Sequence, residues 1–181
     1  MITNALYGLL LLVALAFQTS VLTSLTDPYR LFPLTLVIGI VIMYERSLIL
    51  GGIWIIMAGG ILDARGLGEG LLVSSVVATL VSAGLIYFVL SKRSFWSLFG
   101  VGGGVALAYV VTKLIWSAGL AAFTHERFDL SSSLRQGLMI GVMITLGVFA
   151  LGVIRRRLLT WSQQRFMRKE NLYAISLPEK N

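Results

Sequence analysis

Residues 51–71 read GGIWIIMAGGILDARGLGEGL, and this stretch decides the fold. An apolar run with four glycines ends on a single acid, Asp63, and a short glycine-rich turn leads into a second apolar run. At 100° per residue, one side of the predicted helix carries Gly52, Ile56, Gly59 and Asp63. Because glycine has no side chain, another helix can approach this side closely. We therefore predict a helix that packs tightly in a lipid bilayer.

The composition also indicates a membrane protein. The chain has 181 residues, of which 57% are hydrophobic and 13% are charged; soluble domains carry about 25% charged residues. The net charge of +7 lies mostly next to the hydrophobic segments, so we attribute it to membrane topology and lipid contact and expect no nucleic-acid partner. The chain has no cysteine, which excludes disulfides and thiolate metal sites.

Six apolar stretches predict the fold class, an all-α membrane protein built as a compact bundle of six transmembrane helices. The predicted spans are residues 5–25, 31–44, 47–62, 71–90, 95–123 and 134–154. The first is interpreted as a retained span and not a signal peptide, because no Lys or Arg precedes it and no clear cleavage site follows. The predicted domains are a transmembrane domain, 1–157, and a basic cytoplasmic tail, 158–181.

The second and third spans are short, about 24 Å each as helices. Two short helices joined by a turn at Glu45-Arg46 are favoured over a single span with that pair at its centre. In the single span, each ionised residue would cost about 2.5–3.5 kcal/mol. Five spans in place of six would move the N-terminus to the other side of the membrane.

The distribution of basic residues predicts the orientation. With six spans and cytoplasmic termini, ten Lys and Arg residues lie on the cytoplasmic side and four lie in the outer loops. The positive-inside rule therefore favours both termini in the cytoplasm. The tail is interpreted either as a basic helix along anionic lipid or as a stop signal with a partly disordered end.

Lys113 is the one charge well inside a predicted span. Because such a charge is costly to keep, we predict an outer-leaflet polar cluster of Gln18, Asp63 and Lys113 that ties the first, third and fifth spans together and contributes to structure or partner binding. The alternative is that the long Lys113 side chain reaches the interface on its own.

Glycines outside the opening stretch are also interpreted as packing residues. The cluster at 100–104 resembles a phosphate-binding loop only superficially, because no Gly-Lys-Ser/Thr follows it. The predicted helix-packing residues are Gly52, Gly59, Gly60, Gly102, Gly137 and Gly141.

No enzyme is predicted, and neither a cofactor nor a metal site is expected. The eight acids are scattered, and His125 is the only histidine. A single imidazole without a serine or cysteine partner at a recognisable spacing indicates neither a metal site nor a nucleophile.

Residues 16–96 resemble the rod shape-determining protein MreD family. The resemblance is carried by Ala58-Gly59-Gly60-Ile61-Leu62-Asp63 and by Gly66-Leu67-Gly68, which opens a further span. Looser matches are Gln18, Asp27-Pro28, Phe32-Pro33 and Lys92-Arg93; Leu34 stands where the family commonly has a polar residue.

The resemblance implies an inner-membrane scaffold of the machinery for bacterial cell shape and lateral peptidoglycan synthesis, the elongasome. It also implies an MreC-like bitopic partner and, through it, peptidoglycan synthases and the actin-like cytoskeleton. MreD-like proteins are similar to the substrate-binding S components of energy-coupling-factor transporters. A vitamin-binding S component is therefore the alternative function, for which Tyr29, Tyr109, Trp116, His125 and Arg127 are candidate ligand-binding residues.

Overall fold

The computed structural model describes residues 2–26, 32–65, 71–89, 95–124 and 129–175. Within these ranges the chain forms helices and no strand, which confirms the predicted all-α class. The helices are α1 (Ile2–Ser20) with a 3-10 turn η1 (Leu22–Ser24), α2 (Leu34–Glu45), α3 (Leu48–Ala64), α4 (Leu71–Gly84) with a π-helical end η3 (Leu85–Val89), α5 (Phe95–Thr124) and α6 (Leu130–Ile175).

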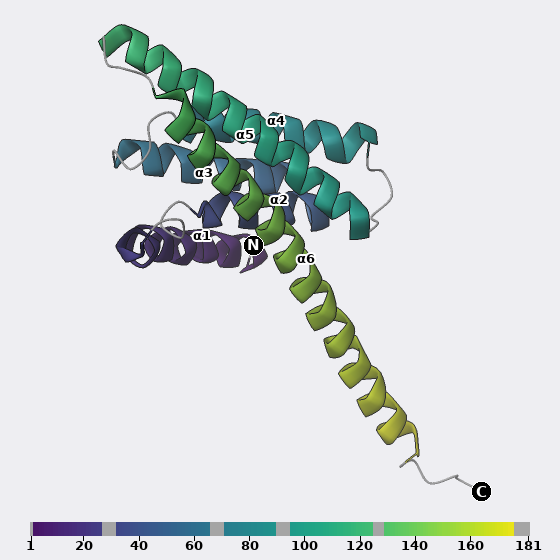
Figure 1. The fold of residues 1–181 in the computed structure, drawn as a ribbon. Coiled ribbons are helices and arrows are strands. Elements are labelled where there is room, and N and C mark those ends of the chain that lie inside the picture. Colours follow the sequence, from purple (N-terminus) through teal and green to yellow (C-terminus); the bar gives the residue numbers. More distant parts are fainter. Residues whose placement is uncertain (1, 27–31, 66–70, 90–94, 125–128, 176–181) are drawn as a thin grey trace, which may run out of the picture.

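Five of these helices close into a ring (Figure 1). Each of α2, α3, α4 and α5 packs against the next helix in the chain, and α6 packs against both α5 and α2. Helix α1 lies at the edge, against α2 and α3. The structure thus brings α2 and α6, which are far apart in sequence, into contact.

Helix α2 is the most enclosed element of the bundle. Nearly every residue from Thr35 to Tyr44 is buried, and Val37 and Ile40 are completely buried. A helix that is apolar on all sides is either enclosed by protein or exposed to lipid, and α2 is enclosed by protein. The chain turns at Arg46 and Ser47, and the Ser47 hydroxyl accepts a hydrogen bond from the Leu50 amide at the start of α3. The two short helices favoured by the sequence are therefore confirmed.

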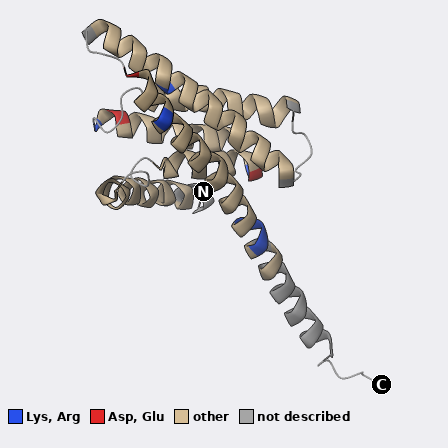
Figure 2. Cartoon of the chain, viewed as in Figure 1, with Lys and Arg blue, Asp and Glu red and all other residues tan. Residues whose placement is uncertain are grey.

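Four long helices are apolar enough to cross a membrane. They contain the segments Leu6–Ser24, Leu71–Phe88, Trp96–Phe123 and Leu130–Leu158, whereas α2 and α3 are shorter apolar helices. Many large apolar side chains on these helices are exposed, among them Leu107 and Leu138, as expected where lipid replaces water. Figure 2 shows that most of the described bundle is uncharged, with few Lys, Arg, Asp or Glu positions along its helices. The chain is a multi-pass helical membrane protein; that α2 and α3 also cross remains a prediction.

The helix that contains the predicted sixth span, residues 134–154, is longer than that span. Helix α6 begins at Leu130 and not at Leu134, because the Asp129 carboxylate accepts hydrogen bonds from the amides of Ser131 and Ser132 and so caps the helix. The helix also continues to Ile175, so the boundary predicted at residues 157/158 falls inside one helix about 69 Å long. Residues 155–175 contain neither Gly nor Pro, and three arginines do not interrupt a helix. Its C-terminal half extends out of the bundle (Figure 1).

The glycines predicted to pack do lie at helix contacts within this chain. Along α3, a Cβ atom added at Gly52 would lie 3.1 Å from Thr79, one at Gly59 would lie 3.1 Å from the Leu71 carbonyl oxygen, and one at Gly60 would lie 3.6 Å from Leu72. Helix α3 therefore packs its glycine side against α4.

The same holds for α5 and α6. A Cβ atom at Gly102 would lie 3.4 Å from Thr145, and Cβ atoms at Gly137 and Gly141 would lie 2.7 and 3.5 Å from Val110. The glycine backbone thus joins helices of the same chain. The sequence had suggested that these glycine-lined faces also contact a partner.

Candidate functional site

A small polar cavity lies among the helices near the end of the bundle opposite the α2–α3 turn. Its volume is about 110 Å³, and every helix from α1 to α6 contributes to its wall. The polar side chains that line it are Gln18, Thr35, Ser75, Tyr109 and Lys113. Thr35, Ser75 and Tyr109 are buried. The cavity is thus a polar chamber inside an otherwise apolar bundle.

One wall of the cavity is fixed by Gln18. Its Oε1 atom accepts hydrogen bonds from the Thr35 amide at 3.0 Å and from the Thr35 hydroxyl at 2.9 Å. Because the first amides of a helix have no partner within that helix, Gln18 of α1 satisfies one at the start of α2. The Thr35 carbonyl oxygen in turn accepts a hydrogen bond from Trp54 Nε1 at 2.9 Å. These contacts join α1, α2 and α3.

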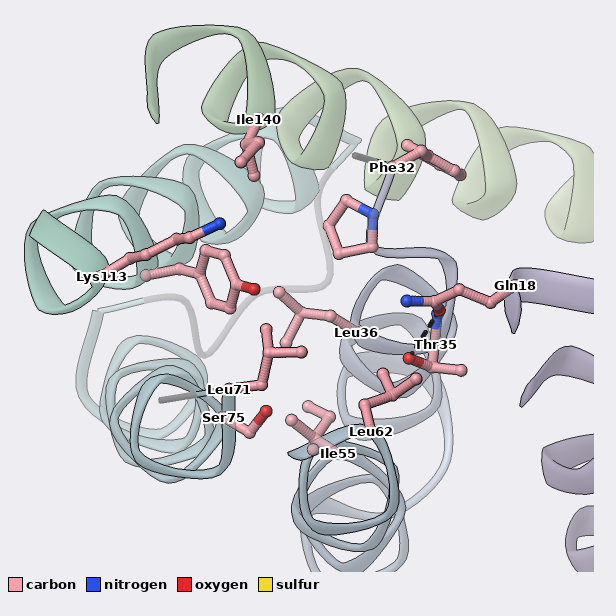
Figure 3. Close-up of a pocket in the computed structure, with 13 residues that line it drawn as sticks. Gln18, Phe32, Thr35, Leu36, Ile55, Leu62, Leu71, Ser75, Lys113 and Ile140 are labelled. Atoms are coloured by element: carbon pink, nitrogen blue, oxygen red, sulfur yellow. Dashed lines mark hydrogen bonds between the residues drawn. The ribbon is translucent and has the colours of Figure 1, made fainter. Parts of the chain in front are cut away.

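The opposite wall carries Lys113 and Tyr109 from α5. Figure 3 shows the Lys113 side chain extending toward Gln18 and Thr35 across the cavity, with Ser75 of α4 beneath them. Tyr109 is only 3% exposed, and within the described part of the chain its hydroxyl forms no hydrogen bond. No side-chain N or O atom of the described residues is both fully buried and unpartnered. The Tyr109 hydroxyl is therefore open to the cavity.

Asp63 lies beside the cavity and stabilises the start of α4. Its Oδ1 accepts a hydrogen bond from the Leu71 amide at 3.0 Å, and its Oδ2 accepts one from the Leu72 amide at 2.9 Å. Both amides begin α4, so the carboxylate at the end of α3 caps the next helix and lies at the positive end of its dipole. Leu62, which precedes Asp63 in the sequence, and Leu71, whose amide donates to Asp63, both line the cavity.

The structure thus brings Gln18 and Lys113 to one cavity and places Asp63 next to it. That Asp63 and Lys113 act together remains a prediction. Of the candidate ligand-binding residues, Tyr109 lines the cavity and Trp116 does not. Tyr29, His125 and Arg127 lie outside the described residues, as do Asp27-Pro28, Gly66-Leu67-Gly68 and Lys92-Arg93 of the resemblance.

A second polar cluster, at the other end of the bundle, was not predicted as a site. The Glu45 carboxylate at the end of α2 forms ion pairs with Arg156 Nε at 3.1 Å and Arg155 at 3.9 Å. The Arg156 guanidinium also lies 5.9 Å from the centre of the Tyr44 ring, and the Tyr44 hydroxyl hydrogen-bonds to Ser97 of α5. The cluster joins α2, α5 and α6 where α6 leaves the bundle. The sequence did offer a signal for this cluster: Glu45 ends a short span on the side of the membrane predicted to hold the three consecutive arginines at 155–157.

A lateral apolar groove runs between α5 and α6. Its volume is about 480 Å³, and it is lined by exposed side chains such as Leu107 and Val142 and by the small residues Gly103, Ala106 and Gly137. A Cβ atom at Gly103 would meet nothing within 4 Å. The groove is therefore open at Gly103, whereas the glycines at its other edge are already packed.

Comparison of the chain with protein families, characterised proteins and solved structures gave no match. Fold and sites together define a multi-pass helical membrane protein with a small polar cavity and an open lateral groove among its described residues. Those residues hold no group of three His, Cys, Asp or Glu side chains placed to bind a metal ion.

Proposed function

We propose that this chain is a non-enzymatic scaffold of the bacterial inner membrane that serves cell-shape control and lateral peptidoglycan synthesis. In this proposal both termini are cytoplasmic, and the chain binds the transmembrane helix of an MreC-like bitopic partner. Peptidoglycan synthases and the actin-like cytoskeleton would be reached through that partner. The resemblance of residues 16–96 to the MreD family motivates the proposal.

The groove between α5 and α6 is the observation that supports it best. It is apolar, it faces sideways from the bundle, and Gly103 allows a second backbone to come close. In lipid, helices associate through close packing of small residues, since the hydrophobic effect does not distinguish a helix from an acyl chain. A single transmembrane helix is therefore a fitting occupant.

The alternative, a vitamin-binding S component, is favoured by the polar cavity. Its volume of about 110 Å³ argues against that function, because sites for small molecules typically measure about 300–1,000 Å³.

Affinity purification of the tagged chain from native membranes tests the proposal. A bitopic coiled-coil protein should co-purify, and an ATP-driven transport module should not. The substitution Gly103→Phe should fill the groove without disturbing the fold and abolish this co-purification. Gly119→Phe is the matched control, since Gly119 is also on α5, has nothing within 4 Å of an added Cβ atom and does not line the groove. Recovery of a transport module, or equal partner recovery with both variants, would contradict the proposal.

A further inference from the structure

The side chains around the polar cavity offer mainly hydrogen-bond donors. Lys113 supplies an ammonium group, and Tyr109 and Ser75 supply hydroxyls. Gln18 uses its Oε1 atom for Thr35, which leaves its amide NH₂ group as the part that can donate. The only formal charge among the lining residues is the positive charge of Lys113. Such a set matches an acceptor that carries negative charge.

Tyr109 and Gln18 present their donors to the cavity in different ways. Tyr109 is buried, yet its hydroxyl has no hydrogen-bond partner among the described residues and opens into the cavity. Gln18 is anchored by two hydrogen bonds to Thr35. Because it opens into the cavity, the Tyr109 hydroxyl can donate a hydrogen bond to a group that enters it.

The size of the cavity limits what enters. At about 30 Å³ per water molecule, 110 Å³ holds three or four waters or one small oxyanion group. Asp63, the nearby acid, does not line the cavity, and its two oxygens already accept the Leu71 and Leu72 amides. The Asp63 charge still acts on Tyr109, so the anion is placed at the Lys113 side of the cavity.

We propose that this cavity binds a single phosphate or carboxylate group through Lys113, Tyr109, Ser75 and the Gln18 amide. The same chemistry is presented by a free anion and by the headgroup of an anionic phospholipid. The cavity lies beside the ends of α1 and α3 and the starts of α2 and α4, where lipid headgroups would lie in the predicted topology. The inference stands apart from the proposed scaffold function, and neither depends on the other.

The test uses the full-length chain in two settings. In a nonionic detergent, thermal unfolding is followed as inorganic phosphate is added, with chloride at matched ionic strength as the reference. In phosphate-free nanodiscs, thermal unfolding is compared between phosphatidylglycerol and phosphatidylcholine, and native mass spectrometry records which lipid the protein retains. A response to phosphate indicates a free anion; a response to phosphatidylglycerol alone indicates a headgroup.

Three variants make the result specific. Lys113→Met removes the ammonium and should weaken anion binding about tenfold or more, since charge-assisted hydrogen bonds are strong. Tyr109→Phe removes only the cavity hydroxyl and should weaken binding about threefold or more. Arg135→Met removes a cation that does not line the cavity and should change nothing. The proposal is overturned if neither anion source stabilises the wild type, or if Lys113→Met and Tyr109→Phe respond as the wild type does.

Discussion

Among the described glycines, Gly51 is the one at which an added Cβ atom would lie closest to the backbone of another helix, and its replacement by alanine tests the packing. A Cβ atom added at Gly51 of α3 would lie 2.5 Å from the Met43 amide nitrogen and 2.7 Å from the Gly39 carbonyl oxygen, both in α2. These are backbone atoms, so no side chain can rotate away. The two short helices would have to move apart.

The size of the effect follows from two opposing contributions. Overpacking a filled interior typically costs about 1–3 kcal/mol. Alanine has the higher helix propensity, and this returns at most about 1 kcal/mol. Because α2 is enclosed on all sides, the strain cannot be released toward lipid. We therefore expect Gly51→Ala to lower the free energy of unfolding by about 1–2 kcal/mol.

Unfolding of the purified chain by a denaturing detergent, followed by circular dichroism, measures this difference. Gly103→Ala is the control, because a Cβ atom there meets nothing within 4 Å; it should leave stability unchanged or raise it slightly. If Gly51→Ala proves as stable as Gly103→Ala, then α2 and α3 do not pack backbone to backbone and the reasoning fails.

Three further predictions concern the charged groups. Glu45→Gln should cost about 1 kcal/mol because it breaks the ion pairs to α6, and a double-mutant cycle with Arg156→Met should show coupling; additive effects would argue against the pair. Asp63→Ala should cost about 0.5–2 kcal/mol through loss of the α4 cap, and unfolding by denaturing detergent measures it; Asp63→Asn should keep part of the cap. Hydrogen bonds from Ser131 and Ser132 lower the pKa of Asp129 below its usual 3.8. Its contribution to stability is therefore present at neutral pH and is lost as the pH falls through that lowered pKa, so the stabilities of wild type and Asp129→Ala, measured against pH, should converge below about pH 4; a constant difference would exclude the cap.

The helices could be predicted from the sequence because each apolar run is bounded by polar or charged residues. The turn at Glu45-Arg46 was predictable for the same reason, since burying both charges at the centre of one span would be costly. The start of α6 was missed because the capping function of Asp129 depends on two local hydrogen bonds within a polar loop. For the tail the sequence left two interpretations open, a basic helix or a stop with a partly disordered end; the helix extends to Ile175, and nothing in the run of arginines disfavours it.

The candidate site was only partly predictable. Lys113 and Gln18 were found because polar groups are conspicuous in apolar spans, and the structure places both at one cavity. Tyr109 was a candidate only for the alternative function, and the contribution of Ser75 was not foreseen, since it depends on how α4 rotates about its axis. Likewise, nothing local to Glu45 reveals that Arg156, 111 residues away, is its partner.

The central claim is that α2 and α3 cross the membrane as a pair, which gives six crossings and places both termini in the cytoplasm. The chain has no cysteine, so single cysteines can be introduced and labelled with a membrane-impermeant maleimide in intact cells. The account predicts that Arg65→Cys, at the end of α3, reacts from outside, while Arg46→Cys, in the α2–α3 turn, and Trp161→Cys, in the α6 extension, react only after permeabilisation. Labelling of Arg46→Cys and Arg65→Cys from the same side would contradict it.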